Sequence, residues 1–350
     1  MTIRTVVVCA TQVPFVHGGA ELHVRGLVEN LRRRGYKAEC ASVPFKWYPK
    51  EELPAQIAAW RMIDLSEANG ERIDVAIGTK FPSYFVRHPN KITWLFHQYR
   101  AIYELIGTPY SEFTHTEADV RLRDRLIGLD TSALKESRAL FSNARNTAER
   151  VGRFNGLDAE PLYHPPPLAG ALKSGAAGDY FLSVGRLEGN KRVDLIIRAM
   201  AHVDRPWRLV IVGEGPLRRD LEALASKMGV ADRVTFAGSV DEPALVDLYS
   251  STAAVVFPPY DEDFGYVTLE AFLSRKPVVT TTDAGGPLEF VIDGVTGAIA
   301  APDADSLAAA MSKAVSDRRL AQSMGDAGYE RVRGITWDHA IDRLMQAAAR

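Results

Sequence analysis

Residues 180–213 read YFLSVGRLEGNKRVDLIIRAMAHVDRPWRLVIVG and hold the pattern that decides the fold class. A short apolar run opens this stretch at residues 180–185, and another closes it at residues 208–213. Between them, residues 193–201 carry apolar side chains at helical spacing. Short, continuously apolar runs are typical of strands that are buried on both faces of a parallel sheet. The stretch therefore predicts a strand, a helix and a second, parallel strand.

The same alternation extends in both directions along the 350-residue chain. Downstream, we expect strands at residues 234–238, 254–258, 277–281 and 297–300, and helices at 217–228, 243–250, 268–274 and 287–293. Upstream, we expect strands at residues 5–8, 74–78, 92–97 and 139–142, and a helix at 21–34 that ends at Gly35. Buried strands alternating with helices predict doubly wound α/β domains.

The alternation is interrupted once, in the middle of the chain. Residues 164–167 read His-Pro-Pro-Pro, which continues neither a helix nor a central strand. Residues 168–179 are rich in Gly and Ala, as flexible linkers are. The sequence therefore predicts two Rossmann-like domains that face a cleft, and ligands bind such sheets at the carboxyl ends of their strands.

The composition is that of a globular protein. Hydrophobic residues make up 46% and charged residues 25% of the chain, which excludes disordered, collagen-like and coiled-coil classes. The net charge of −2 gives no reason to expect nucleic-acid binding. Two cysteines form neither a disulfide framework nor a metal knuckle. No apolar run has the length of a membrane span, and a strand follows Met1 almost at once, so we expect a cytoplasmic protein without a signal peptide.

Residues 1–50 differ from this average in their charge. They carry eight basic and three acidic side chains, a balance of +5. The aromatic residues Phe45, Trp47 and Tyr48 lie in the same segment. The segment fits a solvated helix face best, and the alternative is a membrane-surface patch for a lipid-linked acceptor.

The strongest functional signal is the segment at residues 257–273, FPPYDEDFGYVTLEAFL. Glu262 falls in a loop after a strand, and Glu270 falls inside the following helix. Residues 265–267 then lie at a helix N-terminus, where backbone amides and the helix dipole hold phosphate groups. Carboxylates on either side of a phosphate suit a nucleotide sugar, which has sugar hydroxyls, a diphosphate and ribose hydroxyls in that order.

Other candidates lie at the ends of other predicted strands. Arg186 and Lys191 follow the first strand of the second domain, and both side chains suit phosphate oxygens. The turn at residues 16–20 contains Gly18 and Gly19, which let the backbone approach a ligand closely. His97 ends an apolar strand of the first domain. A second Gly pair precedes Pro287 and offers another helix start.

Taken in order, these motifs resemble the retaining glycosyltransferases of the GT-B fold, in family 4, the glycosyl transferases group 1. The resemblance covers almost the whole chain and includes the segments FSNARNTAERV (141–151), LVIVGEGP (209–216), VTFAGSV (234–240) and GGPLEFVIDGVTG (285–297). It implies an acceptor-side domain at residues 1–167 and a nucleotide-sugar-binding domain at 168–334. Residues 335–350 resemble the family's final helix, which packs back on the first domain.

The resemblance also implies a role for each candidate. Arg186 and Lys191 would neutralise the diphosphate leaving group, Glu262 would hold hydroxyls of the donor sugar, and His97 would lie beside the sugar and the acceptor. These four residues are the expected catalytic set. The expected donor-binding set comprises Glu270 on the ribose, amides that bind phosphate and glycines that leave room for it: Gly18, Gly19, Gly265, Tyr266, Val267 and Glu270.

The implied activity is the metal-independent transfer of a hexose, with retention, from a nucleotide-diphosphate sugar to a hydroxyl group. The acceptor is expected to be a glycan, a lipid-linked molecule or a small molecule in cell-surface polysaccharide or glycoconjugate synthesis. The donor is a co-substrate, and no cofactor or metal is expected. The protein would be cytoplasmic, with peripheral contact at the inner face of the membrane. The alternatives are a nucleotide-sugar epimerase or sugar phosphorylase of the same fold, and a non-catalytic sugar-binding relative.

Overall fold

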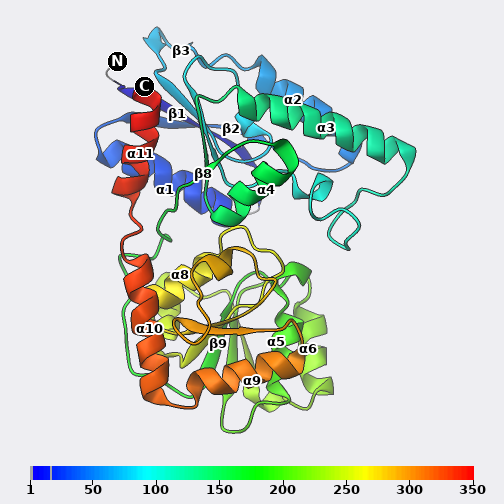
Figure 1. The fold of residues 1–350 in the computed structure, drawn as a ribbon, viewed down its shortest axis with the longest axis vertical. Coiled ribbons are helices and arrows are strands. Elements are labelled where there is room, and N and C mark those ends of the chain that lie inside the picture. The colour runs from blue at the N-terminus through cyan, green and yellow to red at the C-terminus, as the bar shows by residue number, and fades with distance from the viewer. Residues whose placement is uncertain (1–2, 16–17) are drawn as a thin grey trace. The chain divides into compact units, whose positions relative to one another are not determined.

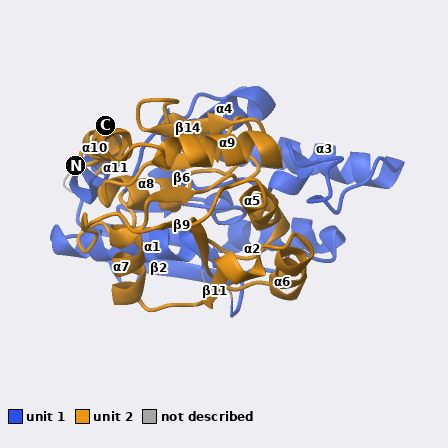
Figure 2. Ribbon diagram, turned by 90° about the horizontal axis from the view of Figure 1, so that it is seen from below, with its two compact units in different colours: residues 1–164, 336–350 blue, residues 165–335 orange. Residues whose placement is uncertain are grey.

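The computed structural model describes residues 3–15 and 18–350. The chain divides into two compact units, residues 1–164 with 336–350 and residues 165–335, which are coloured separately in Figure 2. The sequence analysis ended the first domain at residue 167 and the second at residue 334. Each unit is built on its own six-stranded sheet, in which every pair of neighbouring strands is parallel. This architecture confirms the predicted α/β fold class (Figure 1).

The sheet of the first unit has the order β2-β1-β5-β6-β7-β8. Its strands are β1 (Thr5–Gln12), β2 (Lys37–Pro44), β5 (Val75–Gly78), β6 (Lys91–Leu95), β7 (Ala139–Ser142) and β8 (Glu160–Pro161). Its helices are α1 (Gly19–Arg33), α2 (Leu53–Met62), α3 (Glu117–Lys135), α4 (Arg145–Asn155) and α11 (Trp337–Ala349). Short 3₁₀ turns lie at η1 (Lys50–Glu52), η2 (Ser83–Phe85) and η3 (Arg100–Ile102), and β3 (Glu67–Ala68) pairs with β4 (Glu71–Arg72) in a separate hairpin.

The side chains of β1 point alternately to the two faces of this sheet, and helices cover both faces. Val6 and Val8 point to the face that α1 and α11 cover, and Val7 and Cys9 point to the face that α2, η2 and α3 cover (Figure 1). Successive side chains of a strand point to opposite faces, so a continuously apolar strand supplies two cores at once.

The last helix, α11, belongs to the first unit although it follows the second unit in the sequence. Its apolar side chains share a core with those of α1. At the crossing, a Cβ on Gly26 of α1 would lie 2.6 Å from the indole of Trp337, so only glycine leaves room for that ring. The predicted return of the C-terminal helix to the first domain is therefore confirmed.

The sheet of the second unit has the order β11-β10-β9-β12-β13-β14. Its strands are β9 (Tyr180–Val184), β10 (Arg208–Val212), β11 (Val234–Gly238), β12 (Ala254–Val256), β13 (Val278–Thr281) and β14 (Gly297–Ala300). Its helices are α5 (Val193–Met200), α6 (Arg218–Lys227), α7 (Glu242–Ser251), α8 (Tyr266–Leu273), α9 (Ala304–Val315) and α10 (Arg318–Val332), and 3₁₀ turns lie at η4 (Gly189–Lys191), η5 (Ala231–Arg233) and η6 (Gly286–Glu289). The first strand, β9, lies between β10 and β12, so the strand order reverses there, and open α/β sheets bind ligands at such a switch point.

One expectation about an individual element was wrong, and several elements were not predicted. The helix predicted at residues 287–293 is only the 3₁₀ turn η6, because the chain turns away after Glu289 to form strand β14. The edge strand β2 was not predicted. Most residues of β2 are exposed or only partly buried, and polar residues interrupt the apolar run that marks the central strands. Helices α2, α3, α4, α9 and α10 were not predicted either. Among the described residues, no helix has the length and apolar character needed to cross a bilayer.

Candidate functional site

The switch point of the second unit brings two of the predicted residues together. Lys191 lies in η4, which follows β9, and Glu262 lies in the loop between β12 and α8. The Lys191 ammonium forms an ion pair with the Glu262 carboxylate. The two side chains are only 15% and 19% exposed. A half-buried cation and carboxylate therefore lie at the strand ends, as the family resemblance implied.

Arg192, which the sequence reasoning did not single out, holds the backbone of this loop. Its guanidinium donates to the carbonyl oxygens of Pro258 (2.9 Å) and Pro259 (2.6 Å) and to the carboxylate of Asp283 (2.6 Å). Burial raises the pKa of Asp283, but the hydrogen bonds from Arg192 and Thr281, together with the positive charge of Arg192, hold that pKa below its usual range. Arg192 thus fixes the start of the acidic loop, and its place beside Lys191 in a basic turn gave no sign of this.

The acidic loop is also fixed by the segment that follows β13. The Glu262 amide donates to the Ala284 carbonyl (2.8 Å), and the Gly286 amide donates to the Glu262 carbonyl (2.7 Å). A Cβ on Gly286 would lie 2.6 Å from the carbonyl oxygen of Asp263. The Gly pair at residues 285–286 therefore lets two loops pack closely around Glu262.

Gly265 opens helix α8 in a conformation that favours glycine. It is the N-cap residue with φ of +81°. A Cβ at this position would also lie 3.1 Å from the Phe257 ring. The first amides of α8, at Tyr266 and Val267, lie at the positive end of the helix, where an anion is stabilised. The three residues therefore lie at the start of a helix, as predicted, and phosphate binding there stays a prediction.

Glu270 lies one turn further along α8 and is buried. Its carboxylate accepts a hydrogen bond of 2.7 Å from the Tyr249 hydroxyl of α7. Burial raises the pKa of Glu270 from 4.5 to about 7, although the hydrogen bond from Tyr249 acts in the opposite direction. Glu270 therefore exchanges a proton near neutral pH, and a ligand that donates hydrogen bonds to it would favour the ionised form. Tyr249 gave no signal in the sequence.

Arg186 has different surroundings from Lys191. It follows β9 by two residues, and its side chain is 53% exposed. The guanidinium pairs with Glu188 at 2.9 Å. Arg186 is therefore available to a ligand at the surface, outside the pair that Lys191 forms with Glu262.

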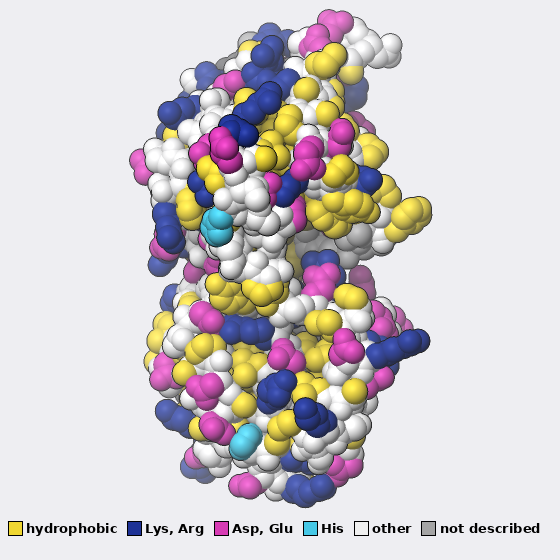
Figure 3. All heavy atoms as spheres, turned by 90° about the vertical axis from the view of Figure 1, so that its right-hand side faces the viewer, with side chains coloured by type: hydrophobic (Ala, Val, Ile, Leu, Met, Phe, Trp, Pro, Cys, Tyr) yellow, Lys and Arg dark blue, Asp and Glu magenta, His cyan; other side chains and the backbone are white. Residues whose placement is uncertain are grey.

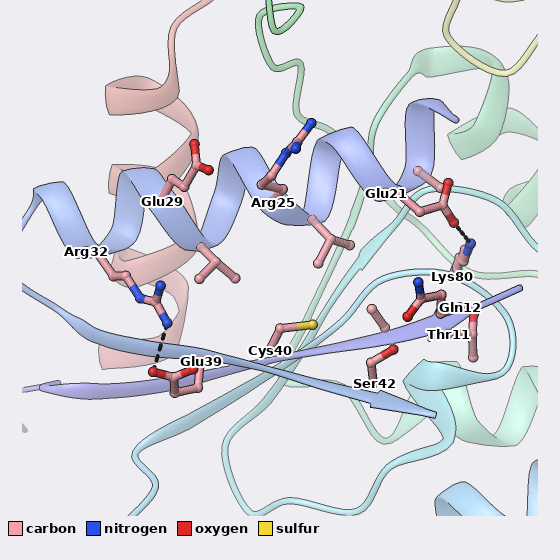
Figure 4. A pocket seen from close by; sticks show the side chains of 14 residues that line it. Thr11, Gln12, Glu21, Arg25, Glu29, Arg32, Glu39, Cys40, Ser42 and Lys80 are labelled. Atoms are coloured by element: carbon pink, nitrogen blue, oxygen red, sulfur yellow. Dashed lines mark hydrogen bonds and ion pairs between the residues drawn. The ribbon is translucent and has the colours of Figure 1, made fainter. Parts of the chain in front are cut away.

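In the first unit, the Glu21 side chain of helix α1 binds the predicted glycine turn. Gly18 caps α1, and its amide donates to Glu21 Oε2 at 3.0 Å. The other oxygen of Glu21 pairs with Lys80 at 2.7 Å, at one end of a groove of about 380 Å³ between α1 and the edge of the sheet (Figure 4). Gly19 is the first residue of α1, and residues 16–17 of the turn lie outside the described residues. The N-terminal end of α1, where the resemblance implied room for phosphate, therefore holds the Glu21–Lys80 pair.

His97 lies two residues beyond strand β6 and is partly buried. Its ring nitrogen Nδ1 lies 2.9 Å from the backbone oxygen of Gln98. The backbone oxygen of His97 accepts a hydrogen bond of 3.3 Å from the amide of Phe81. Both the ring and the backbone of His97 are therefore held by neighbouring backbone groups of the first unit.

Comparison with known proteins supports the same class. The family described as "Glycosyl transferases group 1" matches residues 172–331. The D-inositol 3-phosphate glycosyltransferase of Stackebrandtia nassauensis is 29% identical over 345 residues, which are 87% of this chain and 75% of that protein. The lipopolysaccharide core biosynthesis mannosyltransferase LpcC of Rhizobium leguminosarum is 31% identical over 57% of this chain and 61% of its own length.

Solved structures show the same fold. Sucrose-phosphate synthase from Thermosynechococcus elongatus aligns with a TM-score of 0.73 at 21% identity and covers 98% of both chains. Anabaena HepE, in complex with UDP and glucose, aligns with a TM-score of 0.70 at 15% identity and covers 99% of both chains. These solved structures show that the chain has the GT-B fold, and the relatives at 29–31% identity are glycosyltransferases. More narrowly, residues 172–331 form a glycosyl transferases group 1 domain, which confirms the resemblance seen in the motifs.

Proposed function

We propose that this protein transfers a hexose, with retention and without a metal ion, from a nucleotide-diphosphate sugar to a hydroxyl group. The observation that carries the proposal is the Lys191–Glu262 pair at the switch point of the second sheet. The same loop leads directly into the N-terminus of α8, and the same helix carries the buried Glu270. Lys191 supplies a cation from the turn after β9, and the loop and helix after β12 supply a helix N-terminus and two carboxylates. Together these groups match the parts of a nucleotide sugar.

Loss of the nucleotide leaves negative charge on the diphosphate, and the cations stabilise that charge. Lys191 and Arg186 bind the phosphate oxygens together with the amides of Gly265, Tyr266 and Val267. Removing one such preorganised donor typically costs about 2.7–4 kcal/mol of transition-state stabilisation. Because Glu262 holds Lys191 in the ligand-free protein, the diphosphate must displace the Glu262 carboxylate. Glu262 then accepts hydrogen bonds from hydroxyls of the donor sugar.

Glu270 binds the ribose of the donor. The hydroxyls of a ribose donate hydrogen bonds, and these stabilise the carboxylate over the carboxylic acid. The raised pKa of about 7 therefore falls when the donor binds, and a proton is released. The complex of HepE with UDP and glucose supports a nucleoside diphosphate as the leaving group.

On the acceptor side, His97 contacts the sugar and the attacking hydroxyl. The leaving phosphate accepts the proton of that hydroxyl, which attacks on the same face, and the anomeric configuration is retained. The names of the relatives, which act on an inositol phosphate and in lipopolysaccharide core synthesis, support a role in glycoconjugate or cell-surface polysaccharide synthesis. We place the reaction in the cytoplasm.

The proposed peripheral membrane contact involves a smaller surface than the charge count suggested. Much of the basic charge of residues 1–50 is paired, because Arg34 binds Asp342, Arg32 binds Glu39 and Lys37 binds Glu71. On the face of the molecule seen in Figure 3, basic and acidic side chains are intermixed with uncharged ones. We therefore limit the proposed contact to the segment that carries Trp47 and Tyr48, which are 40% and 55% exposed.

The test measures transfer from a panel of uridine and guanosine diphosphate sugars by the Lys191→Ala and Glu270→Ala variants. Lys227→Ala, at the exposed end of α6, is the matched control, because it removes a lysine of the same unit far along the chain from the site. We expect both site variants to lose transfer while they remain folded, and the control to keep it. Full activity in both site variants would show that the site is assigned wrongly.

The products separate the alternative functions. A phosphorylase would release sugar phosphate with inorganic phosphate and no nucleotide, and an epimerase would return an altered nucleotide sugar. A non-catalytic relative would bind the donor without turnover over a broad acceptor panel. Each of these outcomes would contradict the proposed transfer.

A further inference from the structure

A buried polar network lies behind His97 in the first unit. Its centre is the carboxylate of Asp130, on helix α3, which is fully buried. This carboxylate accepts hydrogen bonds from the hydroxyl groups of Tyr84 and Tyr103 and from Gln98 Nε2, the latter two at 2.6 and 3.0 Å. The four side chains come from η2, the segments after β6 and η3, and α3, so the network joins four parts of the unit.

A second set of hydrogen bonds extends the network to helix α4. Gln98 Nε2 also donates to Asn155 Oδ1 at 2.7 Å, and Asn155 Nδ2 donates to Thr131 Oγ1 at 2.7 Å. The Gln98 side chain, 1% exposed, is therefore held by both α3 and α4. Burying a carboxylate is costly even with good partners, and apolar residues of similar volume often stabilise a fold as well or better. The gain in stability alone therefore does not account for this network. We expect that it also holds the surrounding backbone in one conformation.

The conformation that the network fixes is the backbone at Gln98. The backbone oxygen of that residue is the partner of His97 Nδ1. A carbonyl oxygen only accepts hydrogen bonds, so Nδ1 carries the proton. In the neutral ring the lone pair is then on Nε2, and this nitrogen accepts hydrogen bonds from hydroxyl groups.

We propose that Gln98 and Asp130 are positioning residues that hold His97 as its Nδ1-protonated tautomer, so that Nε2 accepts a hydrogen bond from a hydroxyl of the bound sugar or acceptor. The substrate contact rests on the proposed function. The tautomer does not, because it follows from contacts inside the first unit of the ligand-free protein. The two parts can therefore fail separately.

The experiment reads the tautomer directly, by ¹⁵N NMR of the histidine rings in the full-length, ligand-free protein, with His97→Gln to assign the signals. The wild type should show a protonated Nδ1 and an unprotonated Nε2 above the titration range of the ring. Gln98→Met removes the amide and leaves Asp130 with its two tyrosine donors. We expect this variant to show mixed tautomers, a kcat about tenfold lower and a donor KM changed less than twofold.

Two further variants keep the test decisive. Thr93 lies on β6, the strand before His97, and Thr93→Val removes its partly buried hydrogen bond with Ser137. This variant should lower stability without changing the tautomer or kcat. Gln98→Asn shortens the side chain and replaces Gln98→Met if the latter does not fold. An unchanged single tautomer in the folded Gln98 variants would overturn the positioning role. Mixed tautomers with unchanged kcat would confirm the network and contradict the proposed role of His97.

Discussion

Glu270 combines burial with a function that needs its charge. Its carboxyl lies on helix α8 with Tyr249 as its hydrogen-bond donor, and its pKa is raised to about 7 by burial. Between the ordinary value of 4.5 and this value, the folded chain keeps a proton that the unfolded chain has released. The free energy of unfolding therefore falls as the pH rises through this window and levels off above it.

Glu270→Gln should remove this contribution, because glutamine stays neutral. We expect wild-type stability to fall relative to the variant between about pH 5 and pH 8, with a slope of at most ~1.4 kcal/mol per pH unit. Urea unfolding at a series of pH values measures the difference. Tyr249→Phe is the complementary variant, since losing the hydrogen bond should raise the pKa of Glu270 further and move the window upward. Parallel pH profiles for wild type and Glu270→Gln would contradict the assignment.

Substitutions at Lys191 and at Glu262 should change nucleotide affinity in opposite directions. Lys191→Ala removes a cation from the diphosphate and should weaken UDP or GDP binding by about tenfold to a hundredfold, which corresponds to the roughly 1.5–3 kcal/mol of a charged hydrogen bond. Glu262→Gln removes the carboxylate that competes with the diphosphate, so it should tighten nucleotide binding while lowering transfer. Isothermal titration calorimetry with each nucleotide measures both effects. Weaker binding in both variants would rule out competition between Glu262 and the diphosphate.

At the scale of a single element, helix α8 depends on how its first turn begins. Gly265 adopts a left-handed conformation and lies close to the Phe257 ring, so a side chain meets both a conformational and a steric obstacle. The helix that follows carries the amides and the carboxylate proposed to bind the donor. A change at its first residue therefore affects both stability and binding.

Gly265→Ala should cost about 1–2 kcal/mol for the left-handed conformation alone, and crowding against Phe257 should add to this and weaken nucleotide binding. Gly294→Ala is the matched control, because its φ of +71° is similar and no atom would lie within 4 Å of the new Cβ. Thermal unfolding and nucleotide titration of both variants separate the two costs. Equal losses of stability, with unchanged nucleotide binding in both, would show that the Phe257 contact is unimportant.

At the scale of the whole molecule, the first unit is built from two separate parts of the chain, residues 1–164 and 336–350. Helix α10 ends the second unit, and α11 completes the core of the first unit beside α1. The stability of the first unit thus depends on residues that come after the whole of the second unit. A substitution in the C-terminal helix should therefore lower the stability of the first unit.

Leu344→Ala should destabilise residues 1–164 by about 2–5 kcal/mol, because Leu344 is fully buried in the core that α11 shares with α1 and β1. Hydrogen exchange read by mass spectrometry should show faster exchange in β1 and α1. Met324→Ala, also buried but on α10, is the control and should affect the second unit instead. Faster exchange confined to residues 165–335 in Leu344→Ala would contradict the assignment of α11.

The sequence predicted every central strand of both sheets, because buried parallel strands need continuous apolar runs such as residues 180–185. It also placed Glu262 before, and Glu270 within, the helix that begins after Gly265, because these positions depend only on local order. It missed the edge strand β2, in which polar residues interrupt the apolar run, and it extended the short turn η6 into a helix. It also missed helices α2, α3, α4, α9 and α10.

The residues themselves determined the fold class, the match of residues 172–331 to the glycosyl transferases group 1 model and the candidate phosphate-binding turn, since these follow from local periodicity and from motifs in order along the chain. Only the tertiary structure decided which groups are partners: Arg192 with Asp283, 91 residues apart, Glu21 with Lys80, 59 residues apart, and Gln98 with Asp130, 32 residues apart. The physical reason is that a hydrogen bond or ion pair depends on distances of about 3 Å, and separation along the chain does not set such distances until the sheets and helices have packed.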